Sequence, residues 1–411
     1  MTAPFEFHET AAESPGEDRY ARQRLIPGWR QDRIAEARIL VAGAGALGNE
    51  AIKNLALLGI GKICIVDFDR VEPSNLARCV LFRAGDVGRA KAQAAARAAM
   101  EINPDVEASA LEGDIGYDLG EGELRGYDLV LGCLDSIGAR WMLNRQCRRA
   151  GVAWLNAGIS ARVGQVSLYT PLAGACYECG MTRSQWQRMN ERRSCLLAGQ
   201  RMADAQPQAA SVLPAAWTAA LLVQQAVAWL HRDALGIAGS LQPGEMLSID
   251  VQQNAMQVLP LPQNPRCAAH AADAEWIAPE VLLESAPEAL CAEDIFRVVP
   301  DAVAWLPPQE IVTGLECAQC GTESVLLPLR HLHRERLACP HCSTLRLPRL
   351  AQPVQRGSAL ALEKLHRLGV PHQAILDVQT QQGIRRVELT VPRPGCLRPA
   401  RTAQPARAGA E

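Results

Sequence analysis

A glycine-rich segment followed by a distant acid is the clearest chemical signal in the sequence. Gly43, Gly45 and Gly48 have the spacing G-x-G-x-x-G, between a short apolar run and a segment of helical periodicity. Glycines with this spacing permit a tight turn and let backbone N–H groups approach a phosphate at the start of a helix. Asp67 ends the next apolar run, where a carboxylate can bind ribose hydroxyls. The pattern predicts a nucleotide site, with a tight structural turn as the alternative, and taken alone it would suggest NAD.

Polar and charged residues beyond the glycines favour phosphate chemistry over hydride transfer. Asn75 and Arg78 are three positions apart, so on a helical turn they share a face. Lys91 opens a predicted helix, and Asp135 follows an apolar strand at the end where open sheets place ligands. Each charge alone could be a solvated surface group. Two cations and two acids near one nucleotide, however, suit a reaction in which phosphate charge must be neutralised.

Seven of the 14 cysteines have metal-ligand spacings. Two C-x-x-C pairs stand 18 residues apart, as in a zinc ribbon: Cys317, Cys320, Cys339 and Cys342. Four thiolates form a closed site, so a zinc ion there would be structural. A further C-x-x-C pair, Cys176 and Cys179, and a C-x-x-H pair, Cys267 and His270, lie far apart in the sequence.

The elements that must position these residues alternate between strand and helix. Short apolar runs and helical periodicity predict strands at 37–42, 62–66, 106–111, 129–133 and 152–156, with helices at 49–58, 87–100 and 140–150. This alternation indicates an α/β fold, Rossmann-like, with a mostly parallel sheet covered on both faces. Two strands near 246–250 and 255–260 would close this domain.

The rest of the chain predicts small additions to that domain. We expect a disordered N-terminus at 1–18, the nucleotide domain at 19–270 with a polar crossing segment at 180–211, and a linker at 271–310 rich in Ala, Pro and Glu. A zinc ribbon at 311–350 would precede a C-terminal α+β module at 351–392, with a helix at 359–368 and a hairpin after it, and a disordered tail at 393–411.

Charge and hydropathy exclude several classes of protein. The formal net charge is −2, which argues against nucleic-acid binding and membrane-surface binding. The first 18 residues are acidic and polar and show no secretory signal, so we expect a cytoplasmic location. The apolar stretch 213–230 is long enough for a membrane span, but it contains Pro214, Gln224 and Gln225. We therefore expect a buried helix.

Six motifs in a fixed order carry a family resemblance. They are Arg19-Tyr-Ala-Arg-Gln23, Gly43-Ala-Gly-Ala-Leu-Gly48, Asp67-Phe-Asp69, Ser74-Asn-Leu-Ala-Arg78, Val87-Gly-Arg-Ala-Lys91 and Cys133-Leu-Asp-Ser136. Over about residues 19–270 the chain resembles the ubiquitin-activating superfamily, which includes the ThiF, MoeB and HesA proteins. The resemblance implies ATP rather than NAD.

The resemblance also implies a role for each site residue. Asp67, with Asp69 in the same motif, would hold the ribose; Asn75, Arg78 and Lys91 would line the triphosphate. Asp135 would hold Mg²⁺, and Arg22 would reach the phosphates from the other subunit of a homodimer. The family usually has Asn after the metal-binding acid, whereas here it is Ser136. A structural zinc would be held by Cys176, Cys179, Cys267 and His270, with histidine in place of the family's fourth cysteine.

Cys195 is the candidate nucleophile. It follows Arg192-Arg193-Ser194, and neighbouring cations lower a thiol pKa. Superfamily members that form a thioester carry their cysteine in this same crossing segment. The alternative is a free loop thiol in an enzyme that only adenylates. Cys64, Cys133 and Cys147 lie in predicted core elements.

The leading hypothesis is an enzyme that adenylates the C-terminal glycine of a ubiquitin-like protein and passes it through a thioester to a conjugating enzyme, as in a bacterial conjugation pathway. A second hypothesis is an adenylyltransferase for a sulfur-carrier protein of thiamin or molybdopterin synthesis, and a third adenylates a peptide. From other classes, a non-catalytic scaffold subunit and an NAD oxidoreductase stay as alternatives.

Overall fold

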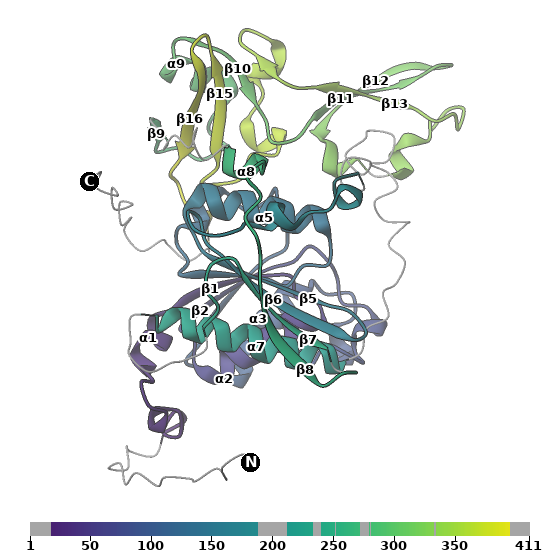
Figure 1. The fold of residues 1–411 in the computed structure, drawn as a ribbon. Coiled ribbons are helices and arrows are strands. Elements are labelled where there is room, and N and C mark those ends of the chain that lie inside the picture. Colours follow the sequence, from purple (N-terminus) through teal and green to yellow (C-terminus); the bar gives the residue numbers. More distant parts are fainter. Residues whose placement is uncertain are drawn as a thin grey trace, which may run out of the picture.

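An eight-stranded sheet with helices on both faces forms the larger part of the molecule (Figure 1). The computed structural model describes residues 18–187, 212–232, 240–250, 252–271, 279, 281–332 and 334–394. In spatial order, the strands are β3 (Glu107–Leu111), β2 (Lys62–Val66), β1 (Arg38–Ala42), β4 (Leu129–Gly132), β5 (Trp154–Ile159), β6 (Val163–Tyr169), β7 (Glu245–Asp250) and β8 (Ala255–Pro260).

The first five strands of this sheet are parallel, and the last three are antiparallel. Strands β1, β2 and β4 are buried along nearly their whole length, which explains their continuous apolar sequences. The chain runs outward from β1 through β2 to β3 and then returns to place β4 on the other side of β1. The carboxyl ends of β1 and β4 therefore form the switch point where open α/β sheets bind ligands. The predicted Rossmann-like fold is confirmed.

Helices cover both faces of the sheet. The face that includes Ile39 and Val41 packs against a core shared by α2 (Ala46–Leu58), α3 (Lys91–Ile102) and α7 (Val212–Leu230). Leu40 and Ala42 point to the opposite core, which includes residues of α5 (Ile137–Ala150) and Leu124 of α4 (Glu121–Leu124). The short helix α1 (Gln31–Glu36) precedes β1.

Helix α7 is the apolar stretch whose length alone would allow a membrane span. Within the described ranges it is the one helix that is long and apolar enough. It packs on α2, β5 and β6, and Ala215, Ala219 and Leu222 are fully buried. The prediction of a buried helix is confirmed.

A second sheet stands above the first in Figure 1 and contains residues that we expected to be a linker. Its strand order is β14 (Val354–Gln355), β10 (Ala302–Leu306), β15 (Ile375–Thr380), β16 (Gly383–Leu389) and β9 (Val281–Leu283). The linker prediction for 271–310 is wrong, because 281–306 supplies β9, β10 and α9 (Ala292–Val298). The apolar side chains Ile295, Phe296 and Trp305 are fully buried in this module's core, despite the Ala, Pro and Glu that surround them.

The predicted helix at 359–368 is also corrected. The structure has two 3₁₀ turns, Ala359–Leu362 and Leu365–Leu368, separated by the extended residues Glu363 and Lys364. The backbone of Lys364 forms a bridge with Cys291, and this pairing is incompatible with a continuous helix. The predicted hairpin is present as β15 and β16, joined at residues 381–382.

A third sheet lies in the region of the predicted zinc ribbon, and Cys317 ends its central strand. Strands β12 (Gly321–Pro328), β11 (Ile311–Cys317) and β13 (Leu347–Ala351) pair antiparallel around β11. Their small core includes Val312, Leu315 and Leu327.

The module built on the second sheet, residues 281–306 and 354–389, is called the C-terminal module from here on. It contacts the first domain through ion pairs and through backbone hydrogen bonds. The Arg125 guanidinium lies 2.7 Å from the Glu388 carboxylate, and Arg149 lies 2.9 Å from Asp377. The Gly122 N–H donates to the Gln373 carbonyl at 2.9 Å. At Gly120 the two backbones approach so closely that a Cβ would lie 2.0 Å from a carbonyl oxygen of the module. The module is therefore docked against α4 and α5.

Candidate nucleotide site and metal centres

The glycine loop lies between β1 and α2, at the switch point of the sheet. Gly43 has a φ of +98°, and its N–H donates to the Val66 carbonyl at 2.8 Å. A Cβ at Gly43 would lie 2.5 Å from the Cys133 carbonyl oxygen, and one at Gly48 would lie 1.9 Å from the Gly43 oxygen. A Cβ at Gly45, in contrast, would meet no described atom within 4 Å. Two of the glycines are thus required by packing, while the third leaves open space at the start of α2.

Asp67 holds the loop by accepting two backbone hydrogen bonds. Its Oδ2 accepts from the Ala44 N–H at 2.7 Å, and its Oδ1 accepts from the Asp69 N–H at 2.8 Å. Burial raises the pKa of Asp67, although the two amide donors and Lys91 oppose this shift. Each carboxylate oxygen keeps a second lone pair, so the side chain can still accept from ribose hydroxyls.

Lys91 lies beside these acids as the first residue of α3. Its ammonium lies 2.8 Å from the Asp69 carboxylate, and its side chain is only 11% exposed. Burial disfavours the charged ammonium, but Asp69 and Asp67 outweigh burial, so the pKa of Lys91 is raised. The side chain is therefore a permanent cation at neutral pH, held near the glycine loop.

The segment after Asp69 positions the next two candidates on one turn. Asn75 is buried, and its Oδ1 accepts from the Glu72 N–H at 3.0 Å. The Arg78 N–H donates to the Asn75 carbonyl at 3.0 Å, which confirms the predicted turn. The Arg78 side chain is half-buried.

Asp135 stands exposed where β4 ends, with the first turn of α5 immediately after it. Ser136 is the N-cap of α5, and its Oγ accepts from the Ala139 N–H at 3.0 Å. Since Asn and Ser are both strong N-cap residues, the departure from the family's usual Asn preserves the cap. The Cys133 N–H donates to the Ala42 carbonyl at 2.8 Å, so this segment lies beside the glycine loop.

Arg22 is the one candidate in the described part of the chain that the structure does not bring to the site. Its neighbours contact the far ends of α2 and α3: Gln23 donates to the Leu57 carbonyl, and Asn103 donates to the Tyr20 hydroxyl. Helix α2 has 13 residues, and at 1.5 Å per residue it spans about 20 Å. Arg22 therefore lies about one helix length from the glycine loop of its own chain.

The first metal-ligand cluster brings together two segments far apart in the sequence. The ligand atoms of Cys176, Cys179, Cys267 and His270 all lie within 4.8 Å of one another. The Cys176 Sγ lies 3.9 Å from that of Cys179 and 3.7 Å from that of Cys267. A tetrahedral zinc with Zn–S bonds of about 2.3 Å separates its sulfurs by about 3.8 Å. The geometry and the ligand types therefore fit zinc, as the sequence predicts.

The second cluster fits the same ion. The four ribbon thiols, Cys317, Cys320, Cys339 and Cys342, also lie within 4.8 Å of one another, and the sulfurs of Cys317 and Cys342 are 3.4 Å apart. Together the two clusters offer one ligand set of Cys₃His type and one of Cys₄ type.

Of the seven remaining cysteines, four are buried, Cys291 is partly exposed, and Cys195 and Cys396 lie outside the described residues. Cys64, Cys133 and Cys147 are buried, as predicted, and burial raises the pKa of Cys133 to about 12. Cys79, near the nucleotide loop, is also buried, and burial raises its pKa. Cys195, the predicted nucleophile, lies outside the described residues.

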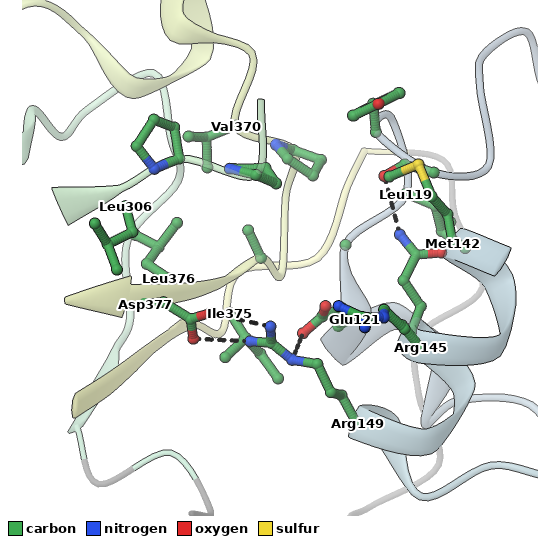
Figure 2. Close-up of a pocket in the computed structure, with 18 of the residues that line it drawn as sticks. Leu119, Glu121, Met142, Arg145, Arg149, Leu306, Val370, Ile375, Leu376 and Asp377 are labelled. Atoms are coloured by element: carbon green, nitrogen blue, oxygen red, sulfur yellow. Dashed lines mark hydrogen bonds and ion pairs between the residues drawn. The ribbon is translucent and has the colours of Figure 1, made fainter. Parts of the chain in front are cut away.

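Sequence reasoning missed a cavity between α5 and the C-terminal module. Three arginines of α5, Arg145, Arg148 and Arg149, line it together with acids from other segments. Figure 2 shows Arg149 between Glu121 and Asp377 at one side of this cavity. The signal in the sequence was the spacing of these arginines, which places all three on one side of a helix.

This combination of fold, glycine loop and charged side chains defines a nucleotide-binding α/β protein with two candidate zinc centres. The family profile described as "ThiF family" matches residues 18–269, well over half of the chain. The chain belongs to the ThiF family.

Curated relatives match the same part of the chain. It is 39% identical over 168 residues to the mouse protein "Adenylyltransferase and sulfurtransferase MOCS3", an alignment covering 40% of this chain and 36% of the relative. It is 36% identical over 165 residues to the "SAMP-activating enzyme E1" of Haloferax volcanii, covering 39% of this chain and 61% of the relative. The chain thus spans less than two thirds of the length of these relatives.

The solved structure of E. coli MccB with ATP has a similar fold. The TM-score is 0.51 at 23% identity, over 62% of this chain and 75% of MccB. At this identity the likeness concerns the fold alone.

Proposed function

We propose that this protein adenylates the C-terminal glycine carboxylate of a small ubiquitin-like or sulfur-carrier protein with Mg-ATP. The observation that carries the proposal is the cluster at the switch point of the sheet. The backbone at Gly45 borders open space there, and Asp67 accepts a hydrogen bond from the same loop. The ion pair of Lys91 and Asp69 lies beside Asp67. Such a site holds a nucleotide and neutralises its phosphates.

The site residues would divide the work by charge. Asp67 would orient the ribose, while Arg78 and Lys91 would contact the phosphates, the latter by exchanging Asp69 for a phosphate oxygen. Asp135 would hold Mg²⁺, which supplies positive charge to the phosphates. The partner's carboxylate oxygen then forms a bond to the α-phosphorus as the bond to pyrophosphate breaks. No proton transfer is required, so positioning and charge neutralisation account for the catalysis.

The names of the relatives support both the reaction and the kind of partner. One is an adenylyltransferase and sulfurtransferase, and the other is a SAMP-activating enzyme. The first name favours a sulfur-carrier protein as the alternative partner, with no thioester step.

Transfer of the acyl group would come after adenylation. Cys195 would accept this group as a thioester, with AMP leaving, before transfer to a conjugating enzyme. The protein would act in the cytoplasm as a homodimer. The position of Arg22 at the far end of α2 supports a dimer, because this side chain can serve a nucleotide site only in another subunit.

ATP–pyrophosphate exchange tests the adenylation step. The assay uses the full chain, Mg-ATP and small proteins ending in glycine from the same genome. We expect exchange with one such partner and its loss in Lys91→Ala. Lys62→Ala, which removes a half-buried lysine of β2 that pairs with Glu107, should exchange normally. If none of the tested partners supports exchange, or if Lys91→Ala exchanges as well as the wild type, the proposal is contradicted. A non-reducing gel of the same mixtures then tests the thioester: an adduct that is lost with Cys195→Ala supports it, and exchange without any adduct favours the sulfur-carrier alternative.

A further inference from the structure

Asn49, one turn into α2, is a fully buried polar side chain beside the glycine loop. Its Nδ2 donates to the Ala44 carbonyl at 2.7 Å and to the Gly45 carbonyl at 3.3 Å. Its Oδ1 accepts from the Leu81 N–H at 2.9 Å. Both amide hydrogens and the amide oxygen therefore have partners, and the types of these partners fix the orientation of the amide.

The two hydrogen bonds to carbonyls set the orientation of two peptide units in the glycine loop. In a trans peptide the C=O of one residue and the N–H of the next point in opposite directions, and the peptides of this loop are trans. Because the Ala44 and Gly45 carbonyls face Asn49, the N–H groups of Gly45 and Ala46 face away from it. These two donors stand at the start of α2, where Gly45 borders open space.

The same two donors are available to a ligand. The first N–H groups of a helix have no acceptor within the helix. Gly45 is the N-cap of α2, and no side chain of the described residues caps this helix. Since the N-terminal end of a helix also favours negative charge, the donors that Asn49 orients suit a phosphate.

The third hydrogen bond of Asn49 reaches the segment that carries two of the candidate phosphate-binding residues. Leu81 is buried and lies three residues after Arg78. The N–H groups of Arg78 and Cys79 both donate to the Asn75 carbonyl, at 3.0 Å and 2.9 Å, so this stretch is a compact turn. An anchor at Leu81 therefore restricts where the turn lies relative to the glycine loop.

We propose that Asn49 is a positioning residue of the nucleotide site. It holds the glycine-loop donors and the Arg78 turn in the arrangement that binds the phosphates of ATP. It acts through the backbone of both segments and does not touch the nucleotide itself. This inference rests on the proposed function, because it requires the phosphates to lie at this loop. A buried amide also stabilises the fold, so the test must separate nucleotide affinity from stability.

The test measures Mg-ATP affinity and unfolding temperature in the full chain by calorimetry. Asn49→Ala removes all three hydrogen bonds and should weaken Mg-ATP binding about tenfold or more. Asn49→Ser should weaken it only about threefold, because a helical serine can donate to the carbonyl four residues earlier, which here is that of Gly45. Gln225→Ala is the control: it removes another buried amide, on α7, which accepts from the Leu241 N–H at 2.7 Å. This control should lower the unfolding temperature and still bind Mg-ATP as the wild type does.

The outcomes separate this inference from the proposed function. If the wild type does not bind Mg-ATP, the proposed function fails and the inference fails with it. If the wild type binds Mg-ATP and the folded Asn49 variants bind it equally well, the inference alone is overturned. It is also overturned if Gln225→Ala weakens binding as much as Asn49→Ala does, because the effect would then follow from lost stability. Circular dichroism checks the fold, and Asn49→Ser decides the matter if Asn49→Ala does not fold.

Discussion

Glu121 provides a quantitative test of how the C-terminal module is docked. Its carboxylate lies 3.0 Å from Arg149 at the junction of α4, α5 and β15, and its side chain is 16% exposed. Burial raises the pKa of Glu121 from 4.5 to about 7, against the opposing effect of Arg149. The unfolded chain therefore loses this proton near pH 4.5, whereas the folded protein keeps it to near pH 7.

The sign of the pH effect follows from proton binding. Between these two values the folded state binds more protons, so the free energy of unfolding falls as pH rises. The stabilisation that comes from proton binding at Glu121 is complete below pH 4.5 and is lost as pH rises through 7. At about 1.4 kcal/mol for each pKa unit, the loss between pH 5 and pH 8 is about 2 kcal/mol after allowance for partial exposure.

The perturbation is Glu121→Gln, which keeps the shape and removes the titration. Thermal unfolding at pH 5 and pH 8, at constant ionic strength, measures the difference between wild type and variant. We expect the wild type to lose about 2–4 °C more than the variant over this interval. Glu101→Gln, at a 69% exposed side chain on α3, is the control and should follow the wild type.

The opposite sign would refute this reasoning. If the wild type gains stability relative to Glu121→Gln as pH rises, then Glu121 is ionised in the folded protein and acts as an ordinary partner of Arg149. Parallel profiles for the two proteins would mean that Glu121 does not titrate differently on folding.

Three further outcomes are expected. In Gly48→Ala the new Cβ would lie 1.9 Å from a carbonyl oxygen, so this variant should lower both the unfolding temperature and the Mg-ATP affinity. Gly45→Ala places its Cβ in open space and should lower the affinity alone. Calorimetry measures both quantities. Elemental analysis should find two zinc ions per chain and one in Cys317→Ser; a full complement in that variant would count against the ribbon site. Arg125→Ala should cost about 2 kcal/mol, because it leaves the 9% exposed Glu388 unpaired. The double variant with Glu388→Gln should recover part of this loss in urea unfolding, and a larger loss instead would argue against the ion pair.

The nucleotide site was predictable because its signal is local. Any side chain at Gly43 or Gly48 would collide with a backbone carbonyl oxygen, so both positions require glycine. The periodicity of the flanking residues identifies β1 and α2. The two cysteine clusters were predictable because the C-x-x-C and C-x-x-H spacings of their ligands are also local signals. Asp69 is a partial case: its motif marked it as a ribose residue, whereas in the structure it is also the ion-pair partner of Lys91.

The C-terminal module was harder to predict because its order depends on contacts between distant residues. Residues 281–306 have little periodicity of their own, and β9 gains its pairing from β16, about a hundred residues later. The two 3₁₀ turns after residue 358 depend on a bridge to Cys291. The cavity could be predicted only in part: the spacing of Arg145, Arg148 and Arg149 places them on one side of α5, whereas the apolar residues that line it come from other parts of the chain.

The close backbone contact at Gly120 has a consequence for the history of the chain. Any side chain there would collide with the carbonyl of His372, so the position can vary only if the module is absent or displaced. Among homologues, presence of a module with this docking should therefore coincide with glycine at this site in the first domain. A lineage that lost the module would be released from the constraint, and the residue would then drift. The contact makes one glycine a marker of domain architecture that could be scored in sequences alone.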